Sequence, residues 1–139
     1  NTWRRGDLNL LDPVRRERFR SEHEFVSRLV GFRLSAAGAG LRPRTAVSPG
    51  WMQVTHQQSG EAFVAVLNAD GQLGPARVLM ACNPHDREVT LALPRTGDWT
   101  PVVVSPFPSC LHAPGPVPRI EGDRVILPPL GAAVWSAGA

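Results

Sequence analysis

Acidic residues are the first candidates for catalysis, because two carboxyl groups placed together can act as a general acid and a general base. Several aspartates of this chain stand in short polar segments with turn composition, where an aspartate commonly bonds nearby backbone: Asp70, Asp86, Asp98 and Asp123. No spacing between acids places two of them as a buried pair. The sequence therefore predicts no catalytic residue within the chain.

Histidines and cysteines are the next group to consider, because they could hold a metal ion. The four histidines fall in different predicted elements and lack ligand spacing: His23, His56, His85 and His112. Cys82 and Cys110 have no regular spacing, so we expect two buried free thiols. Gly38 and Gly40 follow a predicted helix rather than a strand, which does not fit a phosphate-binding loop. The sequence predicts no metal site and no cofactor.

Tryptophan rings could stack on the apolar face of a sugar. Trp51, Trp99 and Trp135 each stand in or beside a predicted strand, where core packing is the alternative interpretation. Trp99 directly follows a turn at residues 95–98, so it is the candidate that we expect to be exposed enough for carbohydrate binding.

Charge is distributed unevenly along the chain. All 15 basic residues are arginines, and ten of them lie in residues 1–44 together with five acids. Residues 45–139 hold five arginines and seven acids, so the predicted β region has no basic stripe of the kind that nucleic-acid binding needs. No run of about 18 apolar residues is present. We therefore expect neither a nucleic-acid partner nor a membrane span.

The elements that must position these residues are mostly strands. Three short apolar runs occupy residues 62–67, 76–82 and 89–93. The third alternates, which predicts one buried and one exposed face, whereas the first two are apolar on both sides and should be central in a sheet. Further strands are expected at residues 51–57, 99–105, 124–127 and 132–137, with a proline-rich loop at 106–119. This pattern predicts a mainly β fold, an antiparallel β-sandwich preceded by one N-terminal α-helix.

The predicted helix covers residues 21–34 and precedes a Gly/Ala-rich linker at 35–40. We therefore divide the chain into an N-terminal part, residues 1–40, and a sandwich domain, residues 41–139. Phe25, Val26, Leu29 and Val30 form an apolar helix face. That face must fold back on the sheet, pair with a second copy or lose order, and we expect a homodimer through helix 21–34.

The order of these features resembles the C-terminal end of enzymes in the α-amylase superfamily, glycoside hydrolase family 13, and most of all the pullulanase-like debranching group. Residues 1–7 (NTWRRGD), with Asn9 and Asp12, resemble the family loop N-S-Y-x-S-G-D-x-x-N-x-x-D-W. Residues 25–33 (FVSRLVGFR) resemble its y-x-x-L-I-x-L-R helix. Four further segments resemble the family's C-terminal β-sandwich: residues 63–68, residues 78–84, the stretch that ends at Trp99, and residues 125–134 (VILPPLGAAV). Pro13 replaces the usual Trp, and residues 34–40 replace a basic R-x-x-H-P-x-x-R phrase.

The resemblance implies a role without catalysis for this chain. Family members cleave α-glucosidic bonds with two carboxyl groups that lie on barrel strands upstream of any segment matched here. It implies that the catalytic barrel is the partner, that the sandwich covers and stabilises it, and that Asp7 and Asn9 lie near the sugar cleft. The chain opens without Met, so we expect it to be a piece of a longer protein. The alternatives are a module that binds α-glucan and an immunoglobulin-like interaction domain.

Overall fold

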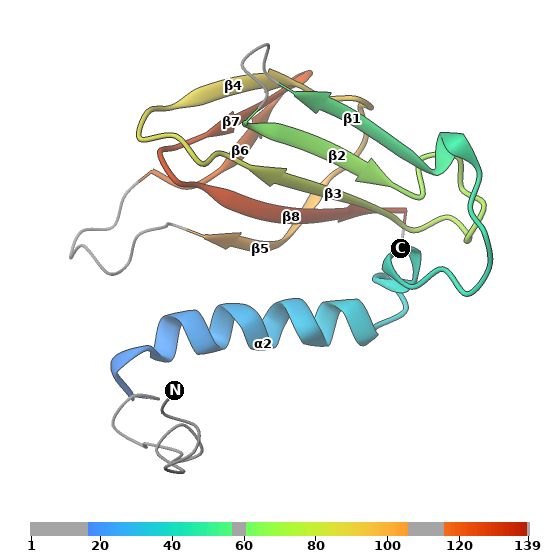
Figure 1. Cartoon of the computed structure of the whole chain (residues 1–139), viewed down its shortest axis with the longest axis horizontal. Coiled ribbons are helices and arrows are strands. Elements are labelled where there is room, and N and C mark those ends of the chain that lie inside the picture. Colours follow the sequence, from blue (N-terminus) through green and yellow to red (C-terminus); the bar gives the residue numbers. More distant parts are fainter. Residues whose placement is uncertain (1–16, 57–60, 106–115, 139) are drawn as a thin grey trace, which may run out of the picture.

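Two antiparallel sheets form the body of the protein (Figure 1). The structure is a computed structural model and describes residues 17–56, 61–105 and 116–138. The larger sheet has the strand order β1 (Met52–His56), β2 (Phe63–Leu67), β3 (Arg77–Cys82), β8 (Ala132–Ala137) and β5 (Thr100–Ser105). The smaller sheet has the order β4 (Val89–Ala92), β7 (Arg124–Leu127) and β6 (Arg119–Glu121).

Helix α2 (Arg20–Leu34) precedes the sheets, as predicted, and lies alongside β5 (Figure 1). Two short 3₁₀ helices, η3 (Ala39–Leu41) and η4 (Pro49–Trp51), connect it to β1. The predicted fold class, an antiparallel sandwich preceded by a helix, is therefore confirmed. No helix among the described residues is long and apolar enough to cross a membrane.

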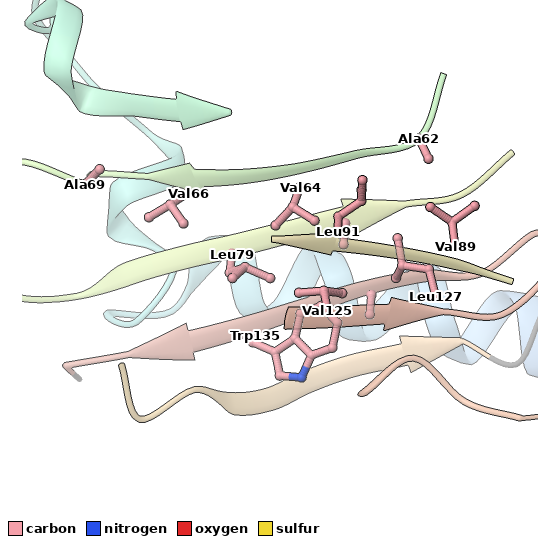
Figure 2. Close-up of a cluster of buried hydrophobic side chains, with 12 residues drawn as sticks. Ala62, Val64, Val66, Ala69, Leu79, Val89, Leu91, Val125, Leu127 and Trp135 are labelled. Atoms are coloured by element: carbon pink, nitrogen blue, oxygen red, sulfur yellow. The ribbon is translucent and has the colours of Figure 1, made fainter. Parts of the chain in front are cut away.

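The main core lies between the two sheets, and Figure 2 shows its side chains. Strands of the larger sheet contribute Val64, Val66, Leu79 and Trp135, and strands of the smaller sheet contribute Val89, Leu91, Val125 and Leu127. β4 alternates as predicted, because Val89 and Leu91 are buried whereas Thr90 and Ala92 are exposed. β2 and β3 are interior strands of the larger sheet, as their two-sided apolar pattern predicted.

A buried asparagine ties the end of β3 to the smaller sheet. The Nδ2 group of Asn83 donates to the carbonyl oxygens of Arg87 at 2.8 Å, Leu127 at 3.2 Å and Pro128 at 2.8 Å. Its Oδ1 accepts a hydrogen bond from the backbone amide of His85 at 3.0 Å. Asn83 is 1% exposed, so these bonds replace those that water would supply, and the bend that the sequence predicted at 83–86 is fixed from within.

A second buried asparagine orders the loop after β2. Asn68 has a φ of 56°, in the left-handed region that asparagine tolerates better than most residues. Its Nδ2 donates to the carbonyl oxygens of Gly74 at 2.9 Å and Ala76 at 2.7 Å, and its Oδ1 accepts from the amide of Leu73 at 2.9 Å. The 68–76 loop is therefore held in one shape by a single side chain.

Three sequence predictions need correction. Trp51 belongs to η4 rather than to a strand, and β1 starts at Met52. The segment predicted as proline-rich loop and turn contains β6, which pairs with β7 across a turn at Gly122. Cys82 is half-buried, not buried, because its side chain lies on the outer face of the larger sheet. The other predicted thiol, Cys110, and the 106–115 part of the loop lie outside the described residues.

Candidate functional site

The predicted carbohydrate-binding residues fall in two places. Asp7 and Asn9 lie outside the described residues, so their arrangement stays a prediction. Trp99 is half-buried just before β5 and packs against the main core. Its Nε1 donates to the carbonyl oxygen of Arg95 at 3.3 Å, which directs the indole N–H at the 95–98 turn. Part of the ring remains accessible, so stacking on a sugar also stays a prediction.

The acidic side chains lie on the surface. Every aspartate and glutamate whose burial the structure describes is exposed. Asp70 takes part in a local network: its carboxylate accepts hydrogen bonds from the Ser48 hydroxyl and from the backbone amide of Gln72, the latter at 3.1 Å. The bond from Ser48, followed by that from Gln72, lowers the pKa of Asp70 from its usual value. Within the described ranges no three His, Cys, Asp or Glu side chains gather closely enough to hold a metal ion.

The outer face of the larger sheet, which turns away from the smaller sheet, is apolar across four strands. Residues directly opposite one another in antiparallel strands point to the same face. Register pairing places Val54 of β1 opposite Ala65, Ala65 opposite Met80, and Met80 opposite Val134. A neighbouring row contains Met52, Leu67 and Val78. The second apolar side of β2 and β3 is thus accounted for by this outer face.

Helix α2 covers part of the outer face. Leu29 and Phe32 of the helix pack against a cluster formed by Leu67, Val78 and Val134. Of the three alternatives open to the predicted helix face, folding back on the sheet is therefore observed for Leu29. The predicted face is divided, however, because Val26 and Val30 of α2 are exposed.

The end of α2 is fixed to the sheet by a short, closely packed segment rather than by a loose linker. The Ser35 hydroxyl donates to the Phe32 carbonyl oxygen at 2.7 Å and accepts from the Gly38 amide at 3.2 Å. Arg42 Nη2 donates to the Ser35 carbonyl oxygen at 3.0 Å. A Cβ atom on Gly38 would come within 2.0 Å of the Phe32 carbonyl oxygen, so this turn requires glycine.

Two apolar areas remain uncovered within the described residues. The first, which we name the sheet patch, consists of Met52, Val54, Phe63 and Met80 on the outer face, with exposures between 36% and 50%. The second, the helix stripe, consists of Val26, Val30 and Leu34, spaced four residues apart on α2 and more than half exposed. Clustered exposed side chains of this size are typical of interaction surfaces. They form the candidate functional site.

The sequence interpretation did not identify the sheet patch. Its signal was present, because β2 and β3 carry apolar residues at both alternating positions. That pattern was used to place the strands in the interior of the sheet. The same pattern also predicts an apolar outer face, which needs a cover.

Comparisons with protein-family models, curated proteins and solved structures find no match for this chain. The candidate site therefore has to be interpreted from its own geometry.

Proposed function

We propose that this chain is the non-catalytic C-terminal β-sandwich of a pullulanase-like glycoside hydrolase that acts on α-glucans, and that it covers and stabilises the catalytic barrel. The observation that carries the proposal is the sheet patch together with the helix stripe. Seven apolar side chains on one sheet face and one helix remain exposed in the described part of the chain. A covering domain needs such a surface, because burial of apolar area is the main source of stability at a permanent interface.

Two further features support this assignment. All acidic side chains whose burial the structure describes are exposed. This is more typical of a supporting domain than of an active site, where burial shifts the pKa of a carboxyl group. The succession of segments that resembles the α-amylase superfamily runs from residue 1 to residue 134 in family order. In that resemblance the segment containing α2 is the last helix of the barrel.

A genomic observation tests the proposal at least cost. The reading frame that encodes residue 1 should continue upstream into sequence that encodes a (β/α)₈ barrel with two carboxyl residues at strand ends. A frame that leads into an unrelated domain would refute the assignment.

The interface is tested on the enzyme that joins this chain to its barrel. Val54→Ser should lower the inactivation temperature of the barrel by several degrees, because a buried valine contributes about 1.5–3 kcal/mol. Val117→Ser is a matched control, since Val117 is 45% exposed against 46% for Val54 but precedes β6 of the other sheet. In the isolated chain both substitutions should change the free energy of unfolding by about 0.5 kcal/mol or less. Equal effects of the two substitutions on the barrel would contradict the proposed interface.

The same surface gives a proposal for the isolated chain, namely a homodimer through α2. The helix stripe has no cover among the described residues, so a second copy would bury it. Sedimentation equilibrium should then show a dimer that Val30→Glu abolishes. A monomer at all concentrations would refute it.

Partial exposure of Trp99 favours a second candidate function, a glucan-binding module. Affinity electrophoresis in gels that contain amylopectin distinguishes it from the first. Retardation that is lost in Trp99→Ala would favour the binding module, and unretarded migration would favour the covering domain.

A further inference from the structure

We propose that a hollow between η3 and the loop after β2 is a binding site for small molecules that carry a phosphate group. The hollow has a volume of about 350 Å³ and is lined by Ala39, Arg42, Arg44, Thr45 and Leu73. Small-ligand pockets span roughly 300–1,000 Å³, so this one suits a phosphate with a small organic substituent. The site is distinct from the sheet patch and does not depend on the proposed function.

Two arginines line the hollow without an acidic neighbour in its lining. The Arg42 guanidinium is held at one end, because Nη2 donates to the Ser35 carbonyl oxygen at 3.0 Å. Its Nε–H is buried and has no acceptor within the described residues. Because that Nε–H is buried, a ligand in the hollow would contact Arg42 through the rest of its guanidinium group.

Arg44 supplies a second uncommitted cation. It is exposed and makes no hydrogen bond or ion pair with any residue in the part of the chain that the structure describes. Two guanidinium groups that face one concave space favour an oxyanion with several acceptor oxygens, and guanidinium matches the geometry of phosphate with paired hydrogen bonds. Thr45 also lines the hollow, and its side chain carries a hydroxyl group that can donate a hydrogen bond.

The remaining walls are rigid and apolar. Leu73 is positioned by Asn68, whose Oδ1 accepts its amide at 2.9 Å. Ala39 begins η3, and its carbonyl oxygen accepts the Arg42 amide at 3.0 Å. Both walls are therefore ordered before a ligand arrives, which reduces the entropy cost of binding. They can contact the organic part of a phosphorylated ligand, whereas the arginines hold its phosphate.

The experiment uses two probes, inorganic phosphate and glucose 1-phosphate, at constant ionic strength, with glucose as an uncharged comparison. Arginine Nε–H signals are followed by ¹H–¹⁵N NMR, because the Arg42 Nε–H belongs to the guanidinium group that a bound phosphate would contact. Saturable shifts of that signal with either phosphate probe, and none with glucose, are expected. Tighter binding of glucose 1-phosphate than of phosphate would assign a role to the apolar walls, and equal binding would confine recognition to the phosphate.

Arg44→Gln should weaken binding about tenfold or more, because it removes one charged hydrogen-bond donor without touching the bond from Arg42 to Ser35. Arg124→Gln is the matched control: Arg124 is exposed on β7 and is not part of the hollow. The proposal is overturned if the Arg42 signal shifts without saturation, if glucose shifts it equally, or if the two variants bind alike.

Discussion

Two glycines near the end of α2 should respond to alanine with opposite signs. Gly31 lies inside the helix, and a Cβ atom placed on it meets nothing within 4 Å. Gly38 lies in the turn that returns the chain to the sheet, and a Cβ atom there would approach three backbone atoms: the Phe32 carbonyl oxygen at 2.0 Å, the Phe32 carbonyl carbon at 2.8 Å and the Arg33 Cα at 2.9 Å. The same methyl group is thus harmless at one site and obstructive at the other.

The magnitudes follow from these surroundings. Gly31→Ala should raise the free energy of unfolding by about 0.5–1 kcal/mol, since alanine loses less backbone entropy than glycine in a helix. Gly38→Ala should lower it by about 1–3 kcal/mol, because the obstructing atoms belong to the backbone and the helix end must shift to admit the methyl group. That shift would loosen the contact of Phe32 and Leu29 with the sheet.

Urea unfolding of the isolated chain measures both changes, and limited trypsin digestion reports where they act. Arg28 and Arg33 are exposed on α2, so cleavage after them should become faster in Gly38→Ala and slower in Gly31→Ala. Stabilisation by both substitutions, or equal cleavage rates in the two variants, would show that α2 is not docked through Leu29 and Phe32. A destabilised Gly31→Ala would show that Gly31 has a packing role that this structure lacks.

Further predictions concern the hydrogen-bond networks. Asn83→Ala should destabilise the protein by about 2–4 kcal/mol in urea unfolding, because it leaves two buried carbonyl oxygens and one part-buried carbonyl oxygen without their donor. Thr90→Ala, on the exposed side of β4, should change stability by less than about 0.5 kcal/mol. An Asn83→Ala variant as stable as the control would contradict that network. The pKa of the Asp70 carboxyl, measured by NMR titration, should lie below its usual value and rise towards it in Ser48→Ala. The pKa of Asp70 is lower in the folded state than in the unfolded state. The stability that Asp70 contributes is therefore present above the unfolded-state pKa of 3.8 and is lost as pH falls through the folded-state pKa. An unchanged pKa of Asp70 in Ser48→Ala would refute the assigned cause.

Local periodicity was enough to predict most of the fold. The strands at 62–67, 76–82 and 89–93 were predicted within a residue or two, because each is an apolar run ended by turn residues. β6 could not be found in this way, since Ile120 stands alone between Arg119 and Glu121 and the strand exists through its pairing with β7. The pairing is local, across the turn at Gly122, but a strand of three residues is too short to show an alternating apolar pattern.

The candidate site was harder to predict than the fold, as α2 illustrates. Both sides of this helix carry apolar residues: one side has Leu29 and Phe32, and the other has Val26 and Val30. The sequence alone therefore does not indicate which side contacts the sheet. The choice is made by packing against Leu67, Val78 and Val134 of the sheet, which is a tertiary contact. The prediction of one apolar face was therefore wrong in detail, whereas the prediction that a helix occupies this segment was confirmed.

The two-sided apolar pattern of β2 and β3 has a consequence for function. The inner side of these strands is fully used by the core between the sheets, through Val64, Val66 and Leu79. In a sandwich without a partner we would expect polar residues on the outer side of these strands, as β4 has at Thr90. Helix α2 covers only part of that outer side, so its own packing does not explain Phe63 and Met80. An apolar partner at the sheet patch does explain them, and for this reason the Val54→Ser comparison bears more directly on function than any test of the acids.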